Sequence, residues 1–231
     1  MKLFLDGADL DSMRRAVREN PLIRGFTTNP TLMRKAGVTD YATWGKEALG
    51  IVGDRPISFE VFSDDFAGME REARIIHGWG SGTYVKIPVT NTRGESTAPV
   101  VRRLTADGVR VNVTAVMTVA QVGVIAGALR EGVPAVVSVF AGRIANTGLD
   151  PVPTMVESLR LLGGLPGVEL LWASPRELLN VFQANDCGCH IITITQGFVD
   201  QLALVGKDLD EYSLETVKMF YDDARAAGYR L

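Results

Sequence analysis

Short apolar runs alternate along the chain with longer amphipathic stretches, and this alternation constrains the fold more than any other feature. Eight runs carry the β-branched or aromatic residues of strands and lie near Gly or Pro. They cover residues 2–6, 23–28, 56–61, 83–88, 109–114, 134–140, 168–174 and 190–195. Helical patterns lie between them at 9–19, 64–80, 118–130, 151–163 and 175–184. Repeated strand–helix units of this kind predict a parallel sheet.

Eight strand patterns in 231 residues, without a Pro/Gly/Ser-rich linker, predict one α/β domain rather than two. We therefore expect a single (β/α)8 TIM barrel over residues 1–231. An additional amphipathic helix is predicted at 213–228, so residues 206–231 form a C-terminal helical extension of the barrel. The pattern leaves two positions for this helix open, on a neighbouring subunit or on its own barrel.

Charge and hydropathy exclude two classes of partner. The net charge of −3 argues against a nucleic-acid-binding protein, which usually has a basic face. Residues 111–129 carry no charge and have about the length of a membrane span. They include Asn112, Thr114, Thr118 and Gln121, so a buried strand followed by a core-facing helix explains the stretch better than a membrane helix.

Two cysteines and two histidines limit the covalent and metal chemistry available. Cys187 and Cys189 are separated by one residue, too close for ordinary disulfide geometry, so we expect free thiols and a cytoplasmic protein. The N-terminal apolar run is interrupted by Asp6 and is too short for a signal peptide. "CGCH" at 187–190 has no second Cys/His cluster, so we predict no metal site.

Polar residues recur in or at the ends of the predicted strands, where barrels of this class carry their chemistry. Each alone is most simply a helix cap, a turn former or a β-former. Together they include two acids and one lysine, which are costly inside a barrel unless they are paired or functional. The set consists of Asp6, Glu60, Lys86, Asn112 and Ser138.

Lys86 lies in the apolar run "TYVKIPVT" at 83–90, where it either extends to solvent or acts as a nucleophile. Burial penalises the ammonium form, and a neutral amine attacks a ketone to form a Schiff base. Asp6 then suits removal of a hydroxyl proton during carbon–carbon cleavage. Glu60 with Thr114 suits the proton transfers and the positioned water that imine chemistry requires.

Two further groups of residues fit the remainder of a substrate. Asn29 and Asn112, at the ends of the second and fifth strands, suit substrate hydroxyls, and Thr28 precedes the first of them. Two arginines and two hydroxyls follow the sixth and seventh strands and suit a phosphate, a sulfonate or a carboxylate. These are Ser138, Arg143, Ser174 and Arg176.

An ordered set of short motifs runs over nearly the whole chain: "FLDGAD", "GFTTNPTL", "FEV", "VKIPVT", "VNVT", "FAGRI" and "ASPRE". In these motifs the sequence resembles the transaldolase family, in particular the small transaldolases related to fructose-6-phosphate aldolase. The resemblance implies a class I aldolase mechanism without metal or cofactor, sugar phosphates as substrates, and a homo-oligomer. It implies Lys86 as the imine-forming residue and Asp6, Glu60 and Thr114 as the acid/base group. It implies substrate-positioning roles for Asn29 and Asn112 and phosphate contacts for Ser138, Arg143, Ser174 and Arg176.

Glu60 and Phe140 distinguish branches within the family that the sequence resembles. The resemblance implies Glu and Phe at these two positions in transaldolases. In the aldolase branch it implies Gln and Tyr. We therefore expect transfer of a dihydroxyacetone unit from a ketose phosphate to an aldose or aldose phosphate. Three alternatives stay open: aldol cleavage, the same chemistry on a modified sugar with another terminal anion, and a non-catalytic sugar-phosphate sensor.

Overall fold

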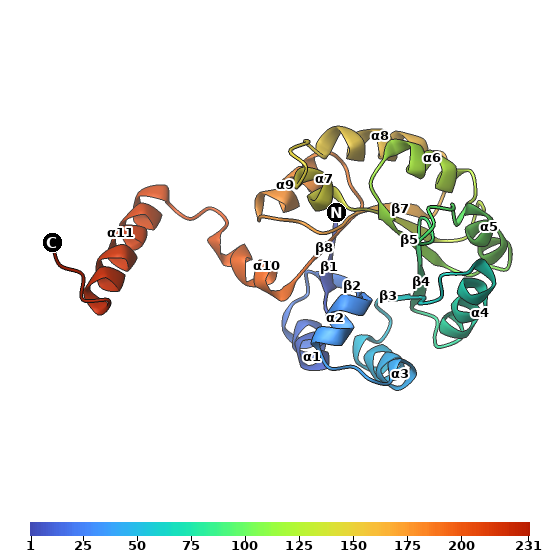
Figure 1. Ribbon diagram of the computed structural model, residues 1–231, viewed down its shortest axis with the longest axis horizontal. Coiled ribbons are helices and arrows are strands. Elements are labelled where there is room, and N and C mark those ends of the chain that lie inside the picture. Colours follow the sequence, from blue (N-terminus) through green and yellow to red (C-terminus); the bar gives the residue numbers. More distant parts are fainter. The chain divides into compact units, whose positions relative to one another are not determined.

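The computed structural model describes residues 1–231 and confirms the predicted barrel. Eight parallel strands close in sequence order, with β8 pairing to β1 (Figure 1). The first and last residues of each strand lie within two residues of the predicted ends. The strands are β1 (Lys2–Asp6), β2 (Ile23–Thr27), β3 (Ile57–Glu60), β4 (Thr83–Pro88), β5 (Val111–Val116), β6 (Ala135–Val139), β7 (Val168–Trp172) and β8 (Ile191–Ile194).

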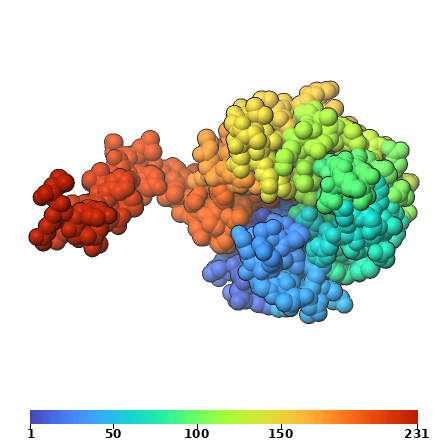
Figure 2. Space-filling view, in the orientation of Figure 1, coloured from blue at the N-terminus to red at the C-terminus, as the bar shows by residue number.

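Helices follow the strands and surround the sheet (Figure 1). Five of them overlap the ranges predicted between strands, and only α9 extends beyond its range: α1 (Leu10–Glu19), α4 (Phe66–His77), α6 (Val119–Ala126), α8 (Val152–Leu162) and α9 (Leu179–Asp186). Others lie outside those ranges: α2 (Pro30–Lys35), α3 (Tyr41–Val52), α5 (Ala98–Ala106), α7 (Ala141–Ala145) and α10 (Gln196–Gln201). On the face seen in Figure 2, the segments coloured blue to yellow adjoin one another as a continuous layer.

Aspartates fix where several helices begin. The side chains of Asp9, Asp40 and Asp65 accept hydrogen bonds from backbone N–H groups in the first turns of α1, α3 and α4. These N–H groups have no partner within the helix, so each cap stabilises its helix by about 1 kcal/mol. The caps set the residue at which each loop ends and its helix in the outer layer begins.

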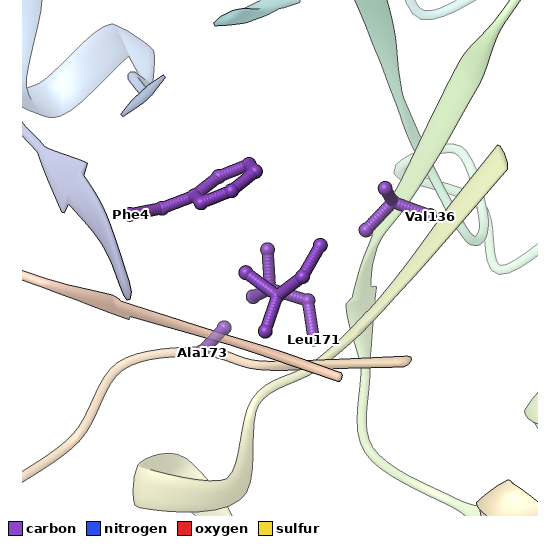
Figure 3. Close-up of a cluster of buried hydrophobic side chains, with 5 residues drawn as sticks. Phe4, Val136, Leu171 and Ala173 are labelled. Atoms are coloured by element: carbon purple, nitrogen blue, oxygen red, sulfur yellow. The ribbon is translucent and has the colours of Figure 1, made fainter. Parts of the chain in front are cut away.

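An apolar cluster fills the barrel interior beneath the polar strand ends. Phe4 from β1, Val136 from β6 and Leu171 from β7 point toward one another, together with Ala173 and Ile191 (Figure 3). All five are less than 6% exposed. The cluster makes the interior a packed core and not a channel, and it forms a floor for whatever the strand ends hold.

Two compact units make up the chain, residues 1–198 and residues 199–231. The second unit contains the 3-10 turn η1 (Leu202–Leu204) and α11 (Leu209–Ala226), which Asp208 caps. This helix covers most of the predicted 213–228 range and begins earlier. Its large apolar side chains are exposed: Leu209, Tyr212, Leu214, Val217, Met219, Phe220 and Tyr221. None of the helices has the length and hydropathy that a membrane span requires.

Gly25 is required by the packing of the barrel core. A Cβ atom at this position would lie 2.5 Å from the Phe4 ring, closer than real Cβ contacts. Gly25→Ala should therefore lower the free energy of unfolding by about 1–3 kcal/mol, measured by urea denaturation. Gly50→Ala in α3 is the matched control, because a Cβ there meets nothing within 4 Å. The steric explanation is wrong if both variants lose stability equally, or if Phe4→Leu fails to rescue Gly25→Ala.

Candidate active site

A cavity of about 550 Å³ opens at the carboxyl ends of the strands. It is lined by all the predicted site residues except Thr28 and Asn112. Those that line it are Asp6, Asn29, Glu60, Lys86, Thr114, Ser138, Phe140, Arg143, Ser174 and Arg176. Loops and strand ends from around the barrel therefore contribute to one site, as parallel strands in a closed barrel require.

Lys86 is buried and does not extend to solvent. Its side chain is 8% exposed, and its Nζ lies 3.2 Å from Glu60 Oε2. The same nitrogen donates a 2.8 Å hydrogen bond to the backbone carbonyl of Thr28. The β3–β4 register pairs Glu60 directly with Lys86, so the strand ladder itself holds the carboxylate beside the amine. A proton can pass between the two groups without any movement of the backbone.

Asp6 keeps some exposed surface toward the cavity but is otherwise surrounded by protein. Burial raises the pKa of its carboxyl, and the nearby Glu60 charge acts in the same direction. The positive charge of Lys86 and a hydrogen bond from Thr27 oppose this rise without cancelling it. The Thr27 hydroxyl donates to Asp6 Oδ1 at 2.7 Å. Asp6 is therefore poised to accept a proton more readily than an aspartate in water.

Asn112 lies beneath the cavity and not on its surface. It is 1% exposed, its Nδ2 donates to Ser58 Oγ at 3.0 Å, and its Oδ1 accepts from Ser138 Oγ at 2.6 Å. The β4–β5 register pairs Asn112 with Lys86. Asn112 thus connects β3, β5 and β6 next to the strand that carries Lys86, and it does not line the cavity itself.

Thr114 has a buried hydroxyl without a hydrogen-bond partner, and it lines the cavity. The next residue, Ala115, has φ of 60°, and the β5–β6 register shifts between Val113 and Val116. Such a conformation is strained for a residue with a Cβ, and strain of this kind clusters at functional sites. The bulge ends the regular alternation of β5 directly after Thr114, at the surface of the cavity.

The predicted anion group lies around the end of β7 and α7. Arg143 and Arg176 are exposed at the cavity, with the Arg143 guanidinium 5.6 Å from the centre of the Phe140 ring. Arg176 Nε donates to Asn146 Oδ1 at 2.9 Å, which fixes the plane of its guanidinium. Ser174 has φ of 62°, a second strained residue in the lining. Two oriented guanidinium groups beside a hydroxyl suit an oxyanion.

Gly142, from the motif "FAGRI", allows these two loops to meet. A Cβ atom there would lie 1.6 Å from the carbonyl oxygen of Ser174. Any side chain at this position would push the end of β7 away from α7. The glycine therefore sets the spacing between Arg143 and Ser174 across the anion group.

Several contributors to the site were not predicted from the sequence. Thr27 and Thr193 hydrogen-bond to one another at 2.6 Å beside Asp6, and Ser58 anchors Asn112. Lys35 at the end of α2 adds a cation to the lining. Strand alternation signals the hydroxyl residues, since each lies an even number of positions from an inward-facing neighbour. Asn29 also has the structural role that an Asn after a strand most simply predicts, because its Oδ1 caps α2 by accepting from Leu32 N at 3.0 Å.

Comparison with known proteins places this chain in a named family. Residues 3–231 match the family model described as Transaldolase/Fructose-6-phosphate aldolase. A probable transaldolase of Thermoanaerobacter sp. (strain X514) is 34% identical over 232 residues, which cover 100% of each chain. Probable transaldolase 2 of Listeria monocytogenes is 35% identical over 196 residues, 84% of each chain. A lysine-centred site in a closed barrel is the setting of an aldolase or transaldolase enzyme, and this chain belongs to the transaldolase/fructose-6-phosphate aldolase family.

Solved structures show the same fold at low sequence identity. Dihydrodipicolinate synthase from Rhodopseudomonas palustris superposes with a TM-score of 0.62 at 16% identity, covering 96% of this chain and 79% of that one. For 3-hexulose-6-phosphate synthase from Salmonella typhimurium, the TM-score is 0.60 at 16% identity, with 84% and 89% covered. These likenesses are evidence for the barrel alone.

The raised pKa of Asp6 predicts that this residue costs stability at neutral pH. The folded protein binds the proton more tightly than the unfolded chain. The free energy of unfolding therefore falls as pH rises from the ordinary value of 3.8 through the folded value. Asp6→Asn should be more stable than the wild type at pH 7, and this advantage should vanish below pH 3.8.

Asp40→Asn provides a control of opposite sign. Hydrogen bonds from Thr43 lower the pKa of Asp40, so its carboxylate adds stability above pH 3.8 that is lost as pH falls through the folded value. Urea unfolding at several pH values measures both variants. An Asp6→Asn protein that is less stable than the wild type at pH 7 would contradict the account.

Proposed function

We propose that the protein is a class I transaldolase, which transfers a dihydroxyacetone unit from a ketose phosphate to an aldose or aldose phosphate. The observation that carries this proposal is the buried Lys86 Nζ, 3.2 Å from Glu60 Oε2 in a cavity that Asp6 and Thr114 also line. A nucleophile, a base beside it and a second acid are the groups that Schiff-base chemistry requires.

In the first half of the proposed reaction, Glu60 takes a proton from Lys86 Nζ. The neutral amine attacks the ketose carbonyl, and loss of water from the carbinolamine gives a protonated imine. Glu60 supplies the proton with which that water leaves. Thr114, whose hydroxyl has no protein partner, holds the water by a hydrogen bond.

Asp6 acts in the bond-breaking step. Its carboxylate removes the proton from the hydroxyl next to the scissile carbon–carbon bond. The electron pair of the broken O–H bond forms the aldehyde carbonyl. The electron pair of the carbon–carbon bond moves to the imine nitrogen and leaves an enamine on Lys86. The acceptor aldose enters after the first aldose has left, and the same steps run in reverse.

Arg143, Ser174 and Arg176 bind the terminal anion of the sugar in this proposal. The two guanidinium groups donate paired hydrogen bonds to the oxygens of a phosphate, and Ser174 adds a hydroxyl. Ser138 now donates its hydrogen to Asn112, so it joins the anion contacts only when a bound ligand turns that hydrogen toward the anion. Asn29 lines the cavity and its amide suits the dihydroxyacetone unit, whereas Asn112 and Thr28 lie beneath the lining and act through the residues that they hold.

Aldol cleavage without an acceptor is the second candidate function. Glu60 and Phe140 favour transfer over cleavage. At these positions the aldolase branch that the sequence resembles has an amide and a phenol, whereas this chain has a carboxylate and a phenyl ring. Phe140 has no hydroxyl with which to protonate the enamine, so the intermediate persists until an acceptor arrives. Another terminal anion, on a modified sugar, would use the same arginines. A sensor without catalysis would have no need for Asp6 and Glu60 beside the lysine.

Borohydride trapping tests the Schiff base. The protein, reduced in the presence of fructose 6-phosphate, should gain a three-carbon adduct that peptide mass spectrometry locates at Lys86. Lys86→Met should gain no adduct and should lose more than about 10³-fold in turnover. Lys46→Met, which removes an exposed lysine of α3, should behave as the wild type. An unmodified wild-type protein with several ketose phosphates would favour the sensor.

The same preparation separates transfer from cleavage. Release of product from fructose 6-phosphate is followed with and without an aldose phosphate acceptor. Transfer predicts turnover only with the acceptor. Rapid release of free dihydroxyacetone in its absence would identify an aldolase.

Arg143→Ala should raise KM for phosphorylated substrates by about 10- to 100-fold, the loss of one hydrogen-bonded charge contact. Unphosphorylated ketoses should be affected much less. Steady-state kinetics with fructose 6-phosphate and fructose measure this difference, and Arg71→Ala on the exposed face of α4 is the charge-matched control. An equal rise in KM for both sugars would show that Arg143 does not bind the terminal anion.

We further propose that the protein is a homo-oligomer located in the cytoplasm. The exposed apolar side chains of α11 are too many for a helix that stays in water, and a second copy or the barrel of the same chain would cover them. Two free cysteines support a reducing compartment. Sedimentation of the wild type and of Val217→Asp decides whether α11 contributes to assembly.

A further inference from the structure

Three side chains from neighbouring strands form one hydrogen-bonded chain at the base of the cavity. The hydroxyl oxygens of Thr193 and Thr27 lie 2.6 Å apart, and Thr27 Oγ1 donates to Asp6 Oδ1 at 2.7 Å. Both threonines are buried, with exposures of 6% and 3%. The β1–β2 register pairs Thr27 with Asp6, and β8 pairs Thr193 with Phe4, which faces the same side as Asp6.

The direction of this chain follows from counting hydrogens. A threonine hydroxyl has one hydrogen, and an ionised carboxylate only accepts. Thr27 gives its hydrogen to Asp6, so the hydrogen between the two threonines must come from Thr193. The order of donation is therefore Thr193 to Thr27 to Asp6. A hydroxyl that accepts one hydrogen bond donates a stronger one, so Thr193 reinforces the contact to the carboxylate.

We propose that Thr193 is a positioning residue, which acts through Thr27 to fix the Asp6 carboxylate and to leave Oδ2 as the atom that takes the substrate proton. Oδ1 is held by Thr27, so Oδ2 is the oxygen that this chain of hydrogen bonds leaves available. Protonation of Oδ1 would require both threonines to reverse and would leave the hydrogen of Thr193 without its present acceptor. The assignment of Oδ2 to the reaction rests on the proposed function; the fixing of the carboxylate does not.

Charged groups on several elements face Asp6 and set the background against which the chain acts. The charge of Lys86 on β4 lowers the pKa of the Asp6 carboxyl, and the charge of Glu60 on β3 raises it. Lys35 of α2 and Asp9, the cap of α1, line an adjoining cavity of about 280 Å³ together with Asp6. The variants proposed below change none of these charges, so a shift in the titration of Asp6 reports the hydroxyl chain.

The direct test is a ¹³C NMR titration of the Asp6 carboxyl, assigned by its absence in Asp6→Asn. Thr27→Val should raise the midpoint by about one pH unit, because a hydrogen bond to a charged group is lost. Thr193→Val should raise it by roughly 0.2–0.5 unit, because the bond from Thr27 is only weakened. The double variant should match Thr27→Val, since Thr193 acts only through Thr27.

Two controls are available within the barrel. Thr193→Ser keeps the hydroxyl and should restore the wild-type midpoint. Thr83→Val removes a buried hydroxyl of β4 that has no hydrogen-bond partner, and it should leave the midpoint unchanged. Circular dichroism of each variant identifies a loss of fold. An unchanged midpoint in folded Thr193→Val, or additive shifts in the double variant, would overturn the positioning role.

Kinetics then test the link to the reaction. In Thr193→Val, kcat should fall while KM stays constant, and the acid limb of the pH profile should move up with the NMR midpoint. A wild type that forms the Lys86 adduct, combined with an unmoved limb in Thr193→Val, would refute this inference and leave the proposed function intact. A wild type without the adduct but with the predicted NMR shifts would refute the proposed function and the role of Oδ2, and would leave the positioning of the carboxylate standing.

Discussion

The ion pair of Lys86 and Glu60 lies where a barrel of this kind is filled mainly by branched apolar side chains. Removing two charges from water costs several kcal/mol for each, and the attraction between them offsets this cost only when the geometry is close. The β3–β4 register provides that closeness, and the Thr28 carbonyl accepts a further hydrogen from the amine. The apolar cluster around Phe4 and Leu171 keeps water out from below. The surrounding barrel therefore holds the two charged groups close together in an apolar interior, where either charge alone would destabilise the fold.

Polar residues of the cavity and of the layer beneath it form two separate hydrogen-bonded chains. One joins Thr193 and Thr27 to Asp6, and the other joins Ser58, Asn112 and Ser138. Each crosses between strands, so each site residue is held by a neighbour in the barrel as well as by its own strand. Fully connected polar groups of this kind make a site rigid before any ligand arrives. The hydroxyl of Thr114 belongs to neither chain and has no protein partner, and it is the hydroxyl that the proposed mechanism assigns to water.

The fold was predictable because each buried strand is a short apolar run rich in β-branched residues. Eight such runs can be distinguished from the stretches between them in the sequence. Helices were predicted where their apolar stripe was regular. α3, with the sequence "YATWGKEALGIV", and α5, with "APVVRRLTA", contain glycines or β-branched residues that disfavour helix, and packing against the barrel overrides this preference. The carboxyl ends of the strands revealed most of the cavity lining. Hydrogen-bond partners such as Ser58 could not be predicted, because they depend on the register between neighbouring strands. The sequence of one strand does not determine that register.

The close approach of Gly142 to the Ser174 carbonyl ties the end of β7 to α7. Because no atom separates them, neither loop can shift without carrying the other. The backbone segments that carry Arg143 and Arg176 are consequently held close together. A chain descended from this one would adapt to a longer or shorter sugar more readily from the opposite wall, where Lys35 and Leu32 of α2 line both cavities and the short helix is joined by exposed turns. Under the proposed function the anion-binding arginines and α2 form different parts of the lining, so substitutions in α2 should change the length of the accepted sugar without changing the anion contacts.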